Sequence, residues 1–190
     1  MVDGFSAVGG PSWARLTGLV QEGFALYGLT GQSLRDFMRG SLGMSDEYIE
    51  GAVSTVFLDY KPVDDLDGAA IRPGCLVSLS AAMPGLVGAV MRRNSPYASF
   101  REAISHGGQA EPETLAREKR CIVRVKLFNS VMRERSPGML AQGIMLEQSR
   151  IAEALGNPLP MGFSSEPAAQ GYMLLKAHFA PGDDRIRLIG

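Results

Sequence analysis

The spacing of apolar and polar positions in the first half of the chain predicts four strands. Residues 53–58 are rich in β-branched and aromatic side chains, and residues 75–79 repeat that character after a Pro-Gly turn. Two earlier apolar runs, residues 13–20 and 24–29, are separated by a short segment that ends in glycine. That spacing favours a β-hairpin, although a helix competes with this interpretation over the same residues.

Helical periodicity in the same half predicts two helices. After Ser33, four apolar residues recur at helical spacing and share one predicted helix face: Leu34, Phe37, Met38 and Leu42. Ser33 and Asp36 match a capping box, in which each side chain reaches a free amide of the first turn. Pro84 is well placed as the first residue of the second helix, which extends to Arg93.

The second half of the chain predicts a small antiparallel sheet with helices on one face. In residues 121–129 apolar side chains alternate with Arg124 and Lys126, as in a half-buried strand. Two further strands and one helix are predicted from the same kind of pattern: residues 172–179, 185–189 and 144–155. The fold class that follows from both halves is α+β.

The composition fits one domain of moderate size or two small ones. The chain has 190 residues, of which 45% are hydrophobic and 21% charged, as in globular proteins that bury a core. A polar, turn-rich stretch at residues 107–117 predicts a boundary between an N-terminal half, residues 1–106, and a C-terminal half, residues 118–190. The link is short, so the two halves could also pack as one domain.

The predicted order strand, strand, helix, strand, strand resembles the β-grasp, or ubiquitin-like, fold. The order and spacing of these elements are similar to those of the sulfur-carrier proteins of thiamine and molybdopterin biosynthesis. Three segments carry the resemblance: the helix at residues 33–43, the strand and turn at residues 56–65, and the last strand at residues 72–79. The resemblance covers residues 13–85, under half of the chain, and implies a β-grasp-like N-terminal half.

Sulfur-carrier chemistry does not follow from this resemblance. A sulfur carrier requires a free C-terminal Gly-Gly, and the matching segment here, Met83-Pro-Gly-Leu, lacks the second glycine and is followed by residues 87–190. The plant-type ferredoxins, another β-grasp group, need four cysteine ligands, whereas this chain has two cysteines. The resemblance therefore implies a scaffold for binding, and the fold alone does not specify the ligand.

The segment at residues 78–93 is the strongest candidate site. Small residues after a strand lead into a helix start, where free backbone amides can bind an anion. Five residues form the predicted anion-binding set: Ser78, Ser80, Gly85, Arg92 and Arg93. The arginines lie about two turns along the helix, ~10 Å from its start, so a packed helix with a solvated basic end is the alternative.

An acidic loop and a few isolated residues offer other chemistry. The carboxylates of Asp64, Asp65 and Asp67 could hold a hard cation, although the spacing is not that of a calcium loop and a solvated turn is the alternative. The two histidines, His106 and His178, have no partner nearby in sequence. No phosphate-binding loop, dinucleotide fingerprint or nucleophile elbow is present, and no cofactor is predicted.

Both cysteines, Cys75 and Cys121, lie in apolar runs and are expected to behave as buried small hydrophobes. The net charge of −1 gives no overall basic footprint for nucleic acid, so no nucleic-acid partner is predicted. No apolar stretch approaches the ~20 residues that span a bilayer, and no secretory signal is visible. We therefore expect a cytoplasmic protein that does not bind membranes.

Two functions remain open at this stage, and the sequence does not decide whether the protein is an enzyme. The first is a non-enzymatic binding or assembly protein, whose partner is another protein or a second copy of the chain. It rests on the apolar helix at residues 84–93 and on the absence of a catalytic set. The alternative is an enzyme or small-ligand binder that recognises an anionic group at residues 78–93.

Overall fold

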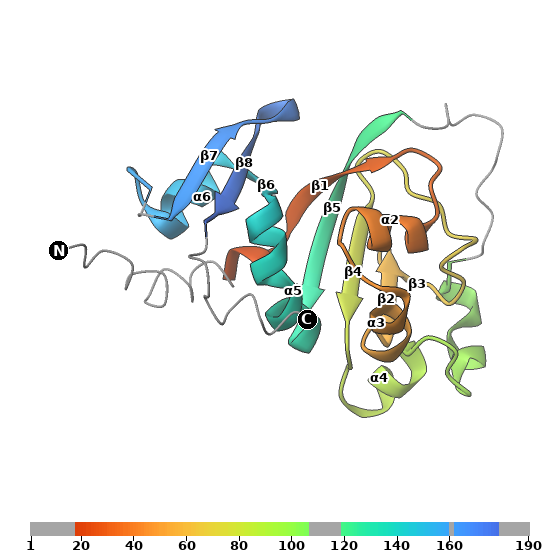
Figure 1. Ribbon diagram of the computed structural model, residues 1–190. Coiled ribbons are helices and arrows are strands. Elements are labelled where there is room, and N and C mark those ends of the chain that lie inside the picture. The colour runs from red at the N-terminus through yellow and green to blue at the C-terminus, as the bar shows by residue number, and fades with distance from the viewer. Residues whose placement is uncertain (1–17, 107–118, 160–161, 179–190) are drawn as a thin grey trace. The chain divides into compact units, whose positions relative to one another are not determined.

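The computed structural model describes residues 18–106, 119–159 and 162–178 (Figure 1). The chain forms two compact units: a larger one, residues 25–131, and a smaller one made of residues 1–24 and 132–190. Both contain helices and strands, so the predicted α+β class is confirmed. The predicted boundary at residues 107–117 and the predicted closing strand at residues 185–189 lie outside the described residues.

In the described residues of the larger unit, five strands lie in the spatial order β3-β2-β4-β5-β1. Their bounds are β1 Phe24–Leu29, β2 Thr55–Leu58, β3 Lys61–Pro62, β4 Leu76–Ser80 and β5 Arg120–Phe128. β2 is antiparallel to both β3 and β4, whereas β4 and β5 are parallel. Strands predicted at residues 24–29, 53–58, 75–79 and 121–129 are therefore confirmed, with ends shifted by one or two residues.

Four helical segments accompany this sheet. They are α2 Leu34–Gly40, α3 Asp46–Gly51, α4 Gly85–Met91 and the 3₁₀ helix η2 Ala98–Ile104. The Ser33 half of the predicted capping box is present, because the Ser33 hydroxyl accepts a hydrogen bond from the Asp36 amide at 3.0 Å. Ser45 caps α3 in the same way through the Tyr48 amide.

The core of the larger unit lies between one face of the sheet and the helices α2 and α3 (Figure 1). The helices contribute fully buried apolar side chains, among them Leu34, Phe37 and Ile49. The strands contribute alternate residues that are also fully buried: Val56, Leu58, Val77, Leu79, Val123, Val125 and Leu127. Since side chains alternate along a strand, the residues between these positions lie on the opposite face.

The strand predicted at residues 121–129 is β5 of the larger unit, where it is parallel to β4. The smaller unit contains an antiparallel sheet in the order β6-β8-β7, of which the alternation predicts β8 alone. Its elements are α5 Asn129–Gln142, which begins in the larger unit, β6 Ile144–Glu147, α6 Gln148–Leu155, β7 Phe163–Pro167, η3 Ala169–Gly171 and β8 Tyr172–Ala177. α6 buries Ile151 and Leu155.

Two sequence predictions about local structure are wrong. The predicted strand at residues 13–20 ends as a helix, because residues 18–22 are helical and the Gly23 amide donates to the Leu19 carbonyl; the earlier residues lie outside the described part. The helix predicted at residues 144–155 divides into β6 and α6. Pairing of Ile144 with Leu175 of β8 extends the first four residues as a strand.

Candidate functional site

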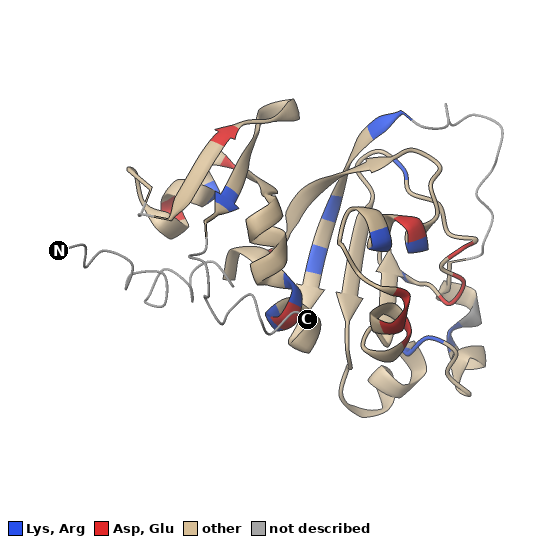
Figure 2. Cartoon of the chain, in the orientation of Figure 1, with Lys and Arg blue, Asp and Glu red and all other residues tan. Residues whose placement is uncertain are grey.

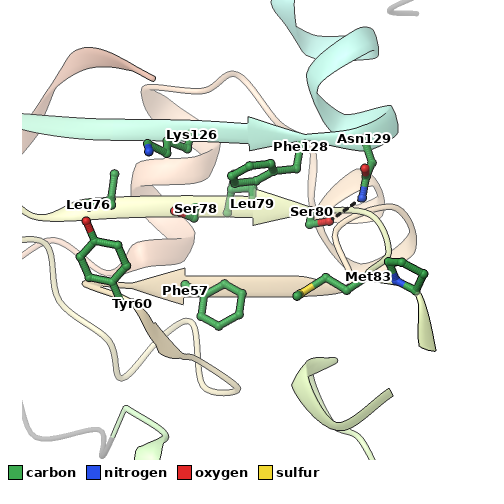
Figure 3. Close-up of a pocket in the computed structure, with 11 residues that line it drawn as sticks. Phe57, Tyr60, Leu76, Ser78, Leu79, Ser80, Met83, Lys126, Phe128 and Asn129 are labelled. Atoms are coloured by element: carbon green, nitrogen blue, oxygen red, sulfur yellow. Dashed lines mark hydrogen bonds between the residues drawn. The ribbon is translucent and has the colours of Figure 1, made fainter. Parts of the chain in front are cut away.

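An open pocket with a volume of about 360 Å³ lies on the sheet face opposite α2 and α3 (Figure 3). Its walls come from β2, β4 and β5 and from the loop that follows β4. Aromatic and aliphatic side chains dominate the lining, notably Phe57, Leu76, Met83 and Phe128. The lining contains one basic residue, Lys126, and no aspartate or glutamate.

Strand register brings the central residues of the pocket together. Phe57 of β2 pairs with Ser78 of β4, and Ser78 pairs in turn with Lys126 of β5. Figure 3 shows these three side chains side by side across the three strands. Ser80 and Phe128 form the next cross-strand pair on the same face of the sheet. The pocket thus combines residues that are far apart in sequence but adjacent across the sheet.

Two polar groups of the pocket, the Lys126 ammonium and the Ser78 hydroxyl, are not bonded to other described residues. Lys126 is half-buried, and no described residue forms an ion pair or a hydrogen bond with its ammonium group. The Ser78 hydroxyl likewise has no partner among the described residues. Two polar groups on adjacent strands are therefore available to a ligand at the same point of the pocket.

The end of the pocket is closed by a hydrogen-bond network around Asn129. Its side-chain amide donates to the Ser80 hydroxyl at 3.0 Å and to the Ala82 carbonyl (Figure 3). The Ser80 hydroxyl also donates to the Ala82 carbonyl at 3.3 Å. These bonds attach the loop after β4 to the first residue of α5, so Ser80 is a structural part of the wall.

The structure separates the members of the predicted anion-binding set. Ser78 and Ser80 line the pocket, and Gly85 begins α4 with a φ of 74°, a backbone conformation that favours glycine. Arg92 follows α4 and is exposed. Arg93 is buried, where it donates to the Ile49 carbonyl at 2.8 Å and pairs with Glu50 at 3.2 Å. The positive charge of Arg93 is thus paired with Glu50 inside the protein.

The three aspartates of the acidic loop each have partners within the larger unit. Asp65 accepts hydrogen bonds from the Asp67 and Gly68 amides, and Asp67 pairs with Arg35 at 2.9 Å. Asp64 pairs with Arg101 at 2.7 Å. Across the described ranges, no group of three or more histidine, cysteine, aspartate or glutamate side chains is placed to hold a metal ion. A metal site at this loop stays a prediction.

Arg101 connects η2 to the end of α4. Its side chain is almost fully buried and donates to the Val90 carbonyl at 2.7 Å, to the Arg92 carbonyl at 3.1 Å and to Asp64. Burial alone would raise the pKa of Asp64. The hydrogen bonds from Arg101 and from the Asn94 amide, together with nearby positive charge, lower that pKa by more, so it lies below the usual range.

Large apolar side chains are exposed on α4, on η2 and at the residue before η2. We call this set the α4–η2 patch, and it consists of Leu86, Val87, Tyr97, Phe100 and Ile104, which are between 47% and 80% exposed. The rings of Tyr97 and Phe100 stack with centroids 6.4 Å apart. α4 carries no charged residue and is tan throughout in Figure 2. Exposed apolar groups in such a cluster are typical of interaction sites.

The cysteines and histidines lie outside both features. Cys75 and Cys121 are buried and free, as predicted. Burial raises the pKa of the Cys75 thiol to about 11, so this thiol stays protonated at neutral pH. Burial, followed by the charges of Arg72 and Lys61, lowers the pKa of His106. His178 is exposed, with its Nε2 atom 2.8 Å from the Ser164 hydroxyl.

Sequence reasoning missed most of the pocket, including Phe57, Lys126, Phe128 and Asn129. One signal was present, because Phe128 is an aromatic residue on the polar face of an alternating strand, directly after Lys126 on that face. The pairing of β5 with β4 was needed to connect that signal to Ser78.

Comparison with known protein families, with curated proteins and with solved structures found no match. Among the described helices, none is both long enough and apolar enough to cross a membrane. The function must therefore be argued from the pocket and the α4–η2 patch.

Proposed function

We propose that the protein is a non-enzymatic binding or assembly protein that contacts a protein partner through the α4–η2 patch. The observation that carries this proposal is the exposure of five large apolar side chains within residues 86–104. Scattered apolar residues are normal on a protein surface, whereas clustered aromatic and aliphatic groups are enriched at the centres of protein interfaces. Leu86 and Phe100, at 76% and 80% exposed, are the expected anchors of the contact.

The backbone that carries the patch is held by partly buried hydrogen bonds. The Ser95 hydroxyl donates to the Ala89 carbonyl at 2.6 Å, and Arg101 joins η2 to the end of α4. The Arg93 amide donates to the Ser54 carbonyl at 2.7 Å, which attaches the segment to the chain before β2. A patch ordered before binding loses less conformational entropy on association, which favours a role in recognition.

The scaffold proposed for this role is β-grasp-like. β1, α2, β2 and β4 occur in the predicted order, which supports the resemblance. The neighbour of β1 within the larger unit is β5 instead of the strand predicted at residues 13–20. The Thr30 amide donates to the Lys119 carbonyl at 2.9 Å, so the end of β1 meets the start of β5. The fold alone does not specify a partner, so the proposal rests on the patch.

Site-specific photo-crosslinking tests this function without assuming which protein is bound. Benzoylphenylalanine is introduced in place of Leu86 or Phe100, and in place of Tyr60 as a control, because Tyr60 is a 77% exposed aromatic outside the patch. We expect a discrete adduct from the two patch positions in cells of the native host and none from position 60. An adduct of twice the chain mass would identify a second copy as the partner. Equal labelling from all three positions, or no adduct, would contradict the proposal.

A second substitution in the patch makes this test specific. Val87→Asp places a charge within the patch, at a side chain that is 61% exposed, so the fold should tolerate it. We expect Val87→Asp to abolish the adduct formed from position 100. An adduct that persists with undiminished yield would mean that the crosslinked protein does not bind the patch.

A further inference from the structure

We propose that the pocket on the open face of the larger unit binds a small organic anion with an apolar body and a single acidic group. Lys126 and Ser78 receive the acidic group, while Phe57, Leu76 and Phe128 contact the body. None of these residues belongs to the α4–η2 patch, so this site is independent of the proposed protein contact.

The ammonium group of Lys126 carries this inference, because it differs from the other partly buried cations of the larger unit. Arg35 pairs with Glu50 at 2.8 Å, and the more deeply buried Arg93 and Arg101 also pair with carboxylates. Lys126 is half-buried within an apolar lining and has no anionic partner in the described part of the chain. A positive charge in such surroundings loses hydration, and an acidic group of a ligand would compensate that loss.

The number of polar groups limits the class of ligand. One ammonium and one unpaired hydroxyl suffice for a single carboxylate or sulfonate, whereas a polyphosphate needs several cations or a series of free backbone amides. Gly85 to Met91 form a helix of only seven residues, and Arg93 is committed to Glu50, so neither extends the anion site. A monoanion therefore fits this pocket better than a nucleotide does.

The size and lining of the pocket define the apolar part of the ligand. A volume of about 360 Å³ lies at the lower end of the range for small-molecule sites. Phe57 and Phe128 project from β2 and β5 on the two sides of the Ser78 position (Figure 3). An aromatic or short aliphatic body would contact both rings while its acidic group reaches Lys126. Because the contacting side chains stand on strands, their positions are well defined before binding.

Two fluorescent probes that differ in charge test this inference on the full chain. Anilinonaphthalene sulfonate has an aromatic body and one sulfonate, and N-phenylnaphthylamine has nearly the same body without the charge. We expect Lys126→Met to weaken binding of the sulfonate probe about tenfold, because a charge-assisted hydrogen bond is lost. Binding of the neutral probe should stay within about twofold, because methionine keeps the apolar stem of lysine. Lys126→Arg should retain most of the affinity for the sulfonate.

Control variants separate the pocket from the patch and from loss of structure. Leu86→Asp changes the α4–η2 patch alone, so it should leave the Lys126-dependent binding unchanged. Unfolding midpoints in urea identify any variant whose probe binding changes because its fold has loosened. A Lys126-dependent sulfonate affinity in proteins of equal stability supports the inference, whatever the crosslinking of the patch shows.

Three results would overturn the inference. Equal loss of both probes on Lys126→Met would show that the lysine supports the fold without recognising charge. No saturable binding of the sulfonate probe to the native chain would remove the site. Salt-sensitive binding of single-stranded oligothymidylate that competes with the probe and requires Lys126 would assign this face to nucleic acid instead.

Discussion

The carboxylate of Asp64 and the guanidinium of Arg101 form an ion pair at 2.7 Å, although 37 positions separate them in the sequence. The pair connects the acidic loop to η2, and Arg101 also donates to the Val90 and Arg92 carbonyls at the end of α4. Asp64 also accepts a hydrogen bond from the Asn94 amide at 3.0 Å, next to the end of α4. A loop that the sequence suggests as a metal site therefore stabilises the segment proposed to bind a partner.

Arg101→Leu should destabilise the larger unit by about 2–4 kcal/mol. The substitution leaves the Val90 and Arg92 carbonyls without their donor and removes the partner of Asp64, and losing one member of a buried pair is costly. Asp64 is 36% exposed and can regain water, which keeps the cost below that of a fully buried carboxylate. Urea unfolding measures the change. Arg92→Leu, at the exposed neighbour, should change stability by less than about 0.5 kcal/mol, and equal losses would contradict the assigned role of Arg101.

Stability should decrease as the pH falls below about 4, in part through Asp64. The pKa of Asp64 is lowered in the folded protein, because the hydrogen bonds from Arg101 and Asn94 outweigh the effect of burial. A lowered pKa contributes stability that is present above the unfolded pKa and is lost as the pH falls through the folded pKa. Unfolding midpoints measured from neutral to acidic pH should therefore decline. Asp64→Asn should lower stability at neutral pH and make the acid decline shallower; an unchanged slope would exclude Asp64 as a contributor.

The elements that depend on nearby residues could be predicted from the sequence, and those that depend on distant contacts could not. The alternation around Arg124 and Lys126 correctly placed β5 and its polar face, because period-two patterning follows from strand geometry. The strand predicted at residues 13–20 was wrong, because β5 supplies a neighbour of β1. The spacing of nearby residues does not indicate that pairing.

In the candidate site, too, some residues could be predicted from nearby sequence and others depend on distant contacts. Ser78 was identified as part of the small-residue segment that leads into α4, but its neighbours Phe57 and Lys126 follow only from strand register. Arg93 was expected as an anion ligand or, alternatively, at a solvated helix end, and instead contacts Ile49 and Val53, more than 39 positions earlier. Burial of an arginine is decided by such distant carbonyl and carboxylate partners, which no local spacing reveals.

Substitution by alanine should destabilise the protein at Gly28 and stabilise it at Gly40. A Cβ at Gly28 would lie 3.0 Å from Val123 and 3.2 Å from the Phe37 ring, so Gly28→Ala forces the core to adjust and should cost about 0.5–2 kcal/mol. At Gly40, the last residue of α2, a Cβ would meet nothing within 4 Å. Gly40→Ala should therefore stabilise the protein by up to about 1 kcal/mol through helix propensity. Thermal unfolding of the two variants compares them, and stabilisation by Gly28→Ala would contradict the close packing of β1.

Asn129 should be required both for stability and for the shape of the pocket. Its φ of 56° is a left-handed conformation that asparagine adopts more readily than most residues, and its amide binds Ser80 and the Ala82 carbonyl. Asn129→Ala loses the hydrogen bonds and strains the backbone, at a cost of about 2–3 kcal/mol. Asn129→Gly loses the same bonds without the strain and should cost less, so the two variants separate these contributions.

A double-mutant cycle determines whether Asn129 acts through Ser80. If the bond of 3.0 Å between them holds the loop after β4, the costs of Asn129→Gly and Ser80→Ala should overlap, and the double variant should be less destabilised than their sum by about 0.5–1.5 kcal/mol. The loop carries Met83, which lines the pocket, so Asn129→Gly should also weaken the sulfonate and neutral probes to a similar extent. Strict additivity of the two substitutions, with unchanged affinity for both probes, would show that the network stabilises α5 without shaping the pocket.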